Sequence, residues 1–330
     1  MRHILRKLEG LLLYGFDRYP EKLHSRIAYI KLTCFPVRIY RILKRFTHQT
    51  SSAETESNKA FVEMAHKTIN PEIPKDASTE SVLVKYSGGS DSTLCAATMA
   101  QHFKTVHLVT FNTNNKKIEN ISADAPRLKR NVQKLRKVFG EDKIKHTFLR
   151  IWETRDKVYF HHYLPHFKNC RDFRKVIICP SCVMAMNLES AVYCRNHGVK
   201  YVTDGSNVET GITAYQSQNP FALQFVSRMF ETFGLAYLVN PNYFDPESDK
   251  RLFEMGVFES SNIKRSFRSR YLQQGCSLTM MFSMTSRLHG ERVGLLDTAV
   301  DRDCDMISTV FKKSVPAFRS YINNRCADSL

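Results

Sequence analysis

The sequence between residues 82 and 93 constrains the fold most, because a β-branched run, two glycines and a helix-compatible segment follow one another without a gap. Such a junction of strand, turn and helix directs several backbone N–H groups to one point, with the positive end of the helix dipole behind them. Gly88 and Gly89 permit positive φ and a close approach of an anion. The stretch therefore predicts a phosphate-binding loop, with hydroxyl donors from Ser87, Ser90 and Ser92.

Asp91 places a carboxylate beside this predicted phosphate site. Carboxylate oxygens suit Mg²⁺, which a bound polyphosphate brings with it, so Asp91 is a candidate magnesium ligand. The loop is not of the Walker type, because no Gly-Lys-Ser/Thr follows the glycines. The plainer alternative is a serine-rich turn that caps an ordinary helix.

The pattern Ser-Gly-Gly-x-Asp-Ser-Thr at residues 87–93 resembles the PP-loop of ATP pyrophosphatases, which cleave ATP to AMP and pyrophosphate while activating a substrate oxygen as an adenylate. The resemblance implies ATP and Mg²⁺ as cofactors and a catalytic role for Asp91. It also implies nucleotide contacts from the tip of the second strand, at Phe111 and Asn112. The loop residues carried over are Ser87, Gly88, Gly89, Ser90, Asp91, Ser92 and Thr93.

The 330 residues are 42% hydrophobic and carry a net charge of +17. The chain can therefore bury a full core, and its charge favours a polyanionic partner such as nucleic acid, unless the whole surface is merely basic. Nine cysteines, an odd number without a secretion signal, fit a reducing compartment, so we expect a cytoplasmic protein. No run approaches the ~20 apolar residues of a membrane span.

From residue 81 onward, strand and helix patterns alternate, with strands expected at 81–86, 105–111, 145–151 and 199–203. Repeated units of this kind predict an α/β fold with a doubly wound parallel sheet and ligands at the carboxyl ends of the strands. We divide the chain into a basic helical extension, a linker, a nucleotide-binding α/β domain and a mainly helical C-terminal region. These four parts are residues 1–46, 47–80, 81–215 and 216–330.

A helix is expected over residues 122–139, with one apolar stripe formed by Leu128, Val132, Leu135 and Phe139. The opposite face of this helix either binds a phosphate backbone or is simply solvated. Its cations are Arg127, Lys129, Arg130, Lys134, Arg136 and Lys137.

Cys179 and Cys182 form a Cys-x-x-Cys pair, with Pro180 just inside the start of a predicted helix. Amides at a helix start lower the pKa of thiols. The pair is a metal half-site, a redox or persulfide-carrying couple, or two core thiols. His162 and His166 have the i,i+4 spacing with which a helix can bind a metal, but Pro165 between them disfavours a regular helix. Packing or contact with the substrate is therefore the preferred interpretation of these histidines.

The order of phosphate loop, Cys-x-x-Cys helix and strand ending in a Gly-containing loop resembles the thiolating branch of the PP-loop superfamily, which includes tRNA 2-thiocytidine and 2-thiouridine synthetases. The resemblance places Gly205, Asn207 and Glu209 at the nucleotide or its metal. Glu209 stands where the family usually has aspartate, and the next family acid is replaced by Thr210. Ser90 likewise replaces the lysine found in the loop of many tRNA thiolases.

Several enzymes of this branch hold a [4Fe–4S] cluster with three cysteines, and Cys276 is the matching third candidate beside Cys179 and Cys182. Alternatives are Zn²⁺ held by these three and either Cys170 or Cys194, or a metal-free persulfide pair. Residues 84–111 also bear a weaker likeness to the 7-cyano-7-deazaguanine synthases.

These observations predict an adenylating enzyme that replaces a carbonyl oxygen with sulfur, on tRNA or a related heterocycle, with a sulfur donor protein as a further partner. The alternatives are nitrogen insertion by a deazaguanine-type ligase and a non-catalytic module that binds ATP or RNA. The sequence does not indicate an oligomeric state.

Overall fold

The protein is described by a computed structural model, which covers residues 62–112, 126–163, 178–208, 218–259 and 298–327, apart from positions 64, 70, 219 and 246. The helical extension predicted at residues 1–46, half of the linker predicted at 47–80, and Cys170 and Cys276 lie outside the described residues.

Five parallel strands form one sheet in the order β3-β2-β1-β4-β5. Their bounds are Ser81–Lys85 (β1), Thr105–Asn112 (β2), Ile144–Arg150 (β3), Tyr201–Asp204 (β4) and Ala236–Tyr237 (β5). The chain moves outward from β1 to β3 and then returns to the other side of β1 with β4. This order reverses between β1 and β4, and ligands of open α/β sheets bind at the carboxyl ends of the strands where the order reverses.

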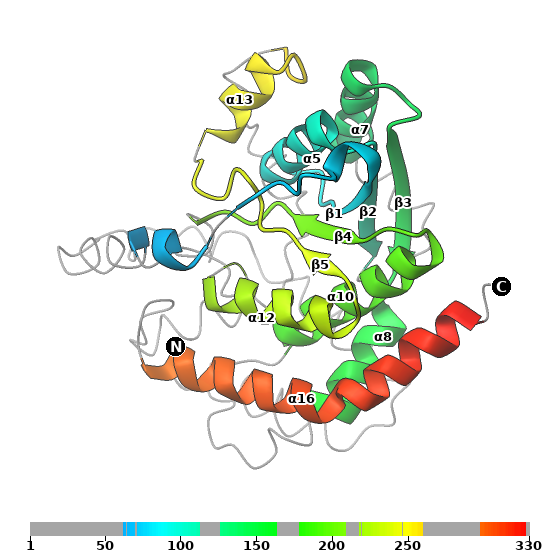
Figure 1. Cartoon of the computed structure of the whole chain (residues 1–330), viewed down its shortest axis with the longest axis vertical. Helices are drawn as coiled ribbons and strands as arrows, with labels where there is room; N and C mark the ends of the chain where they lie inside the picture. Colours follow the sequence, from blue (N-terminus) through cyan, green and yellow to red (C-terminus); the bar gives the residue numbers. More distant parts are fainter. Residues whose placement is uncertain are drawn as a thin grey trace, which may run out of the picture.

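Helices cover both faces of this sheet (Figure 1). One face carries α5 (Ser90–His102), α7 (Pro126–Phe139) and α13 (Ser248–Glu254). The other carries α10 (Ile178–Asn196), α12 (Pro220–Thr232) and α16 (Thr298–Ala327), with α8 (Trp152–Lys157) and the π-helical turn η3 (Val158–Tyr163) beside α10. A short 3₁₀ turn, η2 (Ala77–Thr79), precedes β1. The fold is therefore the doubly wound α/β fold that the sequence predicts.

The alternation of side chains along β1 separates the two halves of the core. Val82 and Val84 pack with α5, whereas Leu83 packs with α10 on the opposite face. Lys85 follows the period of Leu83, because side chains of a strand alternate between faces. It therefore points toward the α10 side at the carboxyl end of the strand.

The predicted elements are found close to their expected positions. The two-residue strand β5 was not predicted, since it is too short to show a hydrophobic period. The helix expected from residue 122 is described from Pro126 onward, with Leu128, Val132 and Leu135 buried. None of the helices in the described parts of the chain is long and apolar enough to cross a bilayer.

Candidate functional site

The phosphate loop predicted after β1 connects Lys85 to the first residue of α5, Ser90. Gly88 has a φ of +75°, which a residue with a Cβ rarely adopts, while Gly89 has a φ of −75°. Only one of the two glycines thus uses the left-handed region. The Ser87 hydroxyl accepts a hydrogen bond from the Gly89 N–H at 3.3 Å and lies 3.0 Å from the Ser92 hydroxyl.

Hydrogen bonds connect the first turn of α5 to this loop. The Thr93 N–H and hydroxyl both donate to the Gly89 carbonyl, at 2.9 and 2.7 Å, and the Tyr86 hydroxyl lies 3.1 Å from the Thr93 oxygen. Burial raises the pKa of Tyr86, so its phenol stays neutral. Thr93 is fully buried, and its hydroxyl is used inside the protein. The N–H groups of Ser90, Asp91 and Ser92 precede this first helical hydrogen bond and have no intrahelical acceptors, so they remain suited to an anion.

Helix α7 holds the loop from outside. The Asn131 side chain donates to the Gly88 carbonyl at 3.0 Å, and Arg127 donates to the Ser90 hydroxyl at 3.2 Å. A Cβ on Gly88 would lie 2.9 Å from the Cβ of Leu128, so this glycine is required by contact as well as by φ. The sequence predicted Arg127 on a basic helix face; the structure places this cation at the phosphate loop instead.

Asp91 lies in the first turn of α5 and is half-buried. Its Oδ1 accepts a hydrogen bond from the Ser248 hydroxyl at 2.6 Å, at the start of α13. A carboxylate with one oxygen fixed in this way suits a hard cation beside a polyphosphate, so Asp91 fits the predicted magnesium ligand.

A second loop, after β4, meets the first. A Cβ on Gly205 would lie 2.5 Å from both the N and the Cα of Ser92, so only glycine allows this close approach. The loop is fixed by Asn240, whose side chain donates to the Ser206 carbonyl at 2.9 Å, and by Gln218, whose side-chain oxygen accepts from the Asn207 N–H at 3.2 Å. The structure therefore brings Gly205 to the phosphate loop, and Asn207 follows two residues later in the same loop. Glu209 lies outside the described residues.

An ion pair between Lys85 and Asp204 joins the ends of β1 and β4, with Nζ and Oδ2 2.8 Å apart and both side chains largely buried. Lys85 also donates to Asn187 of α10 at 2.9 Å and lies over the ring of Tyr237. Burial raises the pKa of Asp204, but the charge and hydrogen bond of Lys85 and the hydrogen bonds of Ser206 outweigh it, so the net pKa is lowered. Sequence reasoning missed this pair; its only signal was a lysine ending an apolar strand.

Phe111 and Asn112 lie at the tip of β2, beyond the last residue that pairs with β1. Asn112 is buried, and its carbonyl accepts from the Ile151 N–H at 3.1 Å. Phe111 packs against the core on the α10 side. Next to them, the Thr110 hydroxyl donates to the Tyr86 carbonyl and lies 3.0 Å from Nε2 of His146.

Helix α10 begins at Ile178, so Cys179 and Cys182 stand in its first two turns, as predicted. Since α10 leads from β3 to the parallel strand β4, its first turn lies at the carboxyl edge of the sheet, where the phosphate loop also lies. It packs, however, on the opposite face from α5. Cys182 is half-buried, while the side chain of Cys179 lies outside the described residues.

The prediction that Cys194 could be a fourth zinc ligand beside Cys179 and Cys182 is wrong. Cys194 stands on the same helix as Cys182, and at ~1.5 Å per residue the two are about 18 Å apart along the axis. Its side chain is fully buried, which raises the pKa of the thiol. Within the described ranges, no group of three or more His, Cys, Asp or Glu side chains is arranged to hold a metal.

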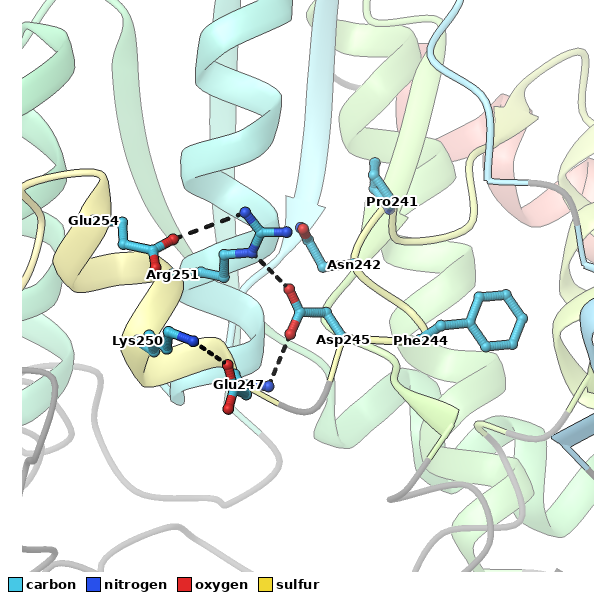
Figure 2. A pocket seen from close by; sticks show the side chains of 8 residues that line it. All are labelled: Pro241, Asn242, Phe244, Asp245, Glu247, Lys250, Arg251 and Glu254. Atoms are coloured by element: carbon cyan, nitrogen blue, oxygen red, sulfur yellow. Dashed lines mark hydrogen bonds and ion pairs between the residues drawn. The ribbon is translucent and has the colours of Figure 1, made fainter. Parts of the chain in front are cut away.

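Two other features do not join the site. His162 packs against the ring of Phe318, with centroids 4.7 Å apart, as the packing interpretation expected. A cavity of about 660 Å³ lies beside α13 (Figure 2), but its charged side chains pair with one another: Arg251 with Asp245 at 3.0 Å, and Lys250 with Glu247 at 2.8 Å. It contains none of the predicted site residues.

Comparison with known proteins gives one family match and one structural similarity. Residues 81–215 match the family model described as "Queuosine biosynthesis protein QueC". Among solved structures, the chain is similar to a U34-tRNA thiolase, NcsA from Methanococcus maripaludis, with its [4Fe–4S] cluster, at 12% identity, 80% coverage of each chain and a TM-score of 0.36. A similarity at this level carries no argument about the site. The comparison with curated proteins found no match.

Proposed function

We propose that the protein is an ATP-using enzyme whose residues 81–215, which match a family model, form a PP-loop domain, and that it adenylates a carbonyl oxygen and then replaces that oxygen with sulfur. The substrate class is tRNA or a related heterocycle. The observation that carries the proposal is the loop at residues 87–93, whose N–H groups and Gly88 form a cradle at the positive end of α5.

In the first half-reaction, this loop holds the β- and γ-phosphates of ATP. The N–H groups at the start of α5 and the guanidinium of Arg127, which is fixed at Ser90, face the negative charge. Asp91 would hold Mg²⁺, which neutralises phosphate charge when it is bound. The carbonyl oxygen of the substrate forms a bond to the α-phosphorus, the bond from that phosphorus to the bridging oxygen breaks, and pyrophosphate leaves. Positioning and charge stabilisation supply the catalysis.

In the second half-reaction, sulfur attacks the carbon that carries the adenylate, and the bond from that carbon to the AMP oxygen breaks. Cys179 and Cys182 are the proposed sulfur-handling pair. If a donor protein supplies the sulfur as a persulfide on one cysteine, its outer sulfur bonds to the substrate carbon. The other thiolate then attacks the sulfur of the first cysteine, the S–S bond to the substrate breaks and releases the thiolated product, and an external thiol must reduce the cysteine disulfide that results. Of the three cysteines proposed for a [4Fe–4S] cluster, the described residues show only the side chain of Cys182, so we derive no step through a cluster or through zinc.

The position of α10 supports this role. Asn187, which accepts from Lys85, stands five residues after Cys182, or ~7.5 Å along the helix axis. Ser87 stands two residues after Lys85, the last residue of β1, and so lies at most ~7 Å beyond it. Because α10 starts at the carboxyl edge of the sheet, both Cys182 and Ser87 lie beyond the Lys85–Asn187 contact in the direction of that edge. The start of α10 and the phosphate loop therefore lie at a similar distance beyond that contact.

The second candidate function is nitrogen insertion by a PP-loop ligase. The match of residues 81–215 to the queuosine biosynthesis family supports it. Metal analysis of anaerobically purified protein separates the two: bound iron and sulfide support the sulfur route, and zinc supports the nitrogen route. Absence of pyrophosphate release with every candidate substrate would instead support a module that binds ATP or RNA without chemistry.

The adenylation step is tested with Asp91→Ala, which we expect to abolish substrate-dependent release of pyrophosphate while the fold is retained. Asp142→Ala, at an exposed acid in the turn before β3, is the matched control and should keep full activity. Unchanged turnover in Asp91→Ala would remove the enzymatic assignment. Cys179→Ala should lose sulfur insertion and keep ATP binding, with Cys326→Ala as its control.

A further inference from the structure

Helix α7 carries cations and no acidic residue. Three of these cations are used inside the protein: Arg127 at Ser90, Lys134 over the ring of Phe258 at 5.2 Å, and Arg136, which donates to the Ile144 carbonyl at 3.2 Å. The other three, Lys129, Arg130 and Lys137, are exposed together with Gln133.

These exposed side chains share one face of the helix. Positions 129, 133 and 137 are spaced by four residues, and position 130 stands next to this row. At ~1.5 Å per residue the row is about 12 Å long. Among the described residues, no acidic side chain pairs with Lys129, Arg130 or Lys137. The face is therefore an unneutralised positive stripe, which we call the α7 stripe.

The α7 stripe has a fixed position relative to the phosphate loop. The first turns of α7 touch that loop through Asn131, which donates to Gly88, and through Leu128, which fills the space beside Gly88. Arg127 at the loop is followed two residues later by Lys129. Positive charge therefore continues from the nucleotide cradle onto the exposed face of the helix without an intervening acid on α7.

We propose that the α7 stripe binds the phosphodiester backbone of an RNA substrate and leads it to the phosphate loop. The inference rests on the proposed function, since it supplies the surface on which an RNA would approach the adenylation site. Lysine and arginine that neutralise phosphates gain affinity by releasing counterions. A membrane surface is the weaker partner, because an interfacial helix turns its apolar face to the bilayer, and the apolar face of α7 (Leu128, Val132 and Leu135) is buried in the core.

The test uses the full-length triple variant Lys129→Gln/Arg130→Gln/Lys137→Gln and a fluorescently labelled tRNA transcript, with binding followed by anisotropy over a range of KCl concentrations. We expect affinity at least tenfold weaker than that of the unaltered protein. The slope of log K against log [KCl] should become shallower by about 2 to 3, since each lost phosphate contact removes ~0.7 to ~0.9. ATP binding should not change, because none of the three residues contacts the loop.

The matched control is Lys67→Gln/Lys312→Gln/Lys313→Gln, which removes the same charge from exposed lysines on other elements. It should bind the transcript nearly as the unaltered protein does. Equal weakening by both triples, or no weakening by the α7 triple, would overturn the proposal. The proposal would also be overturned if the α7 triple variant lost binding to phosphatidylserine vesicles while its RNA binding stayed intact. Pyrophosphate release is measured separately, so RNA binding through α7 without pyrophosphate release would refute the proposed function and not the binding surface.

Discussion

The pair of Lys85 and Asp204 offers the sharpest test of how the two loops are held together. Lys85→Met keeps the length of the side chain and removes its charge, which leaves the carboxylate of Asp204 largely buried without its cation. Removing one partner of a buried ion pair costs ~3–5 kcal/mol, and since both side chains keep some exposure we expect a loss of about 3 kcal/mol in the free energy of unfolding at pH 7. Lys250→Met, at an exposed pair, should leave stability unchanged.

The pH dependence decides whether charge is the cause. In the unaltered protein, the folded pKa of Asp204 lies below its unfolded value of ~3.9, so its contribution to stability is present above that pH and is lost as the pH falls through the folded pKa. Without Lys85, burial raises the folded pKa above the unfolded value, and the charged carboxylate destabilises the variant at neutral pH. The difference between the two proteins should therefore be large at pH 7 and shrink toward pH 4.

Urea unfolding followed by circular dichroism at pH 7, 5.5 and 4 measures this difference. The double variant Lys85→Met/Asp204→Asn removes both charges and keeps an acceptor for Ser206, so it should regain part of the loss. A deficit that is the same at all three pH values, or a double variant less stable than Lys85→Met, would show that packing rather than charge explains the effect.

Two further predictions follow from the contacts around the phosphate loop. Gly205→Ala places a Cβ 2.5 Å from the backbone of Ser92, so we expect a cost of ~1–3 kcal/mol and weaker ATP binding by calorimetry. The control Gly234→Ala meets no atom but has a φ of +75°, so it should lose ~1 kcal/mol of stability and keep ATP affinity; equal ATP affinity in the two variants would contradict the contact. Burial is the main cause, and the positive charge of Arg136 the second, of a pKa of His146 that is lowered to about 4. Its folded pKa is thus below the unfolded ~6.5, so its contribution to stability is present above pH 6.5 and is lost as the pH falls toward 4. An NMR titration of His146 that gives a pKa near 6.5 would refute this environment.

The local parts of the site could be predicted from sequence because they depend on neighbours in the chain. The loop at 87–93 lies inside one strand, turn and helix unit, and the Cys-x-x-Cys pair begins a helix whose start is indicated by Pro180. The strands likewise follow from short apolar runs, because a buried parallel strand shows its character over a few residues.

The missed parts depend on pairings between distant segments. Arg127 reaches Ser90 across 37 positions, and Ser248 reaches Asp91 across 157. Helical periodicity assigns Arg127 only to the polar side of α7, and the sequence gives no indication that this end of the helix lies beside a loop. The exclusion of Cys194 is different, since it follows from the continuity of α10: a helix unbroken from Ile178 to Asn196 fixes the separation of any two of its residues.

The end of β4 connects the two halves of the proposed reaction. Gly205 lies against the backbone of Ser92, in the helix proposed to hold the phosphates. The preceding residue, Asp204, pairs with Lys85, which in turn donates to Asn187 of the cysteine-bearing helix. The last residue of β4 and the residue that follows it therefore contact, respectively, the lysine that binds α10 and the loop proposed to hold ATP. Packed backbone and a buried ion pair deform little. The same residues that fix the loop proposed to hold ATP therefore also fix the position of Cys182 relative to that loop. An enzyme that must bring sulfur to an adenylate after pyrophosphate leaves needs this fixed relation, whereas a module that only binds ATP does not.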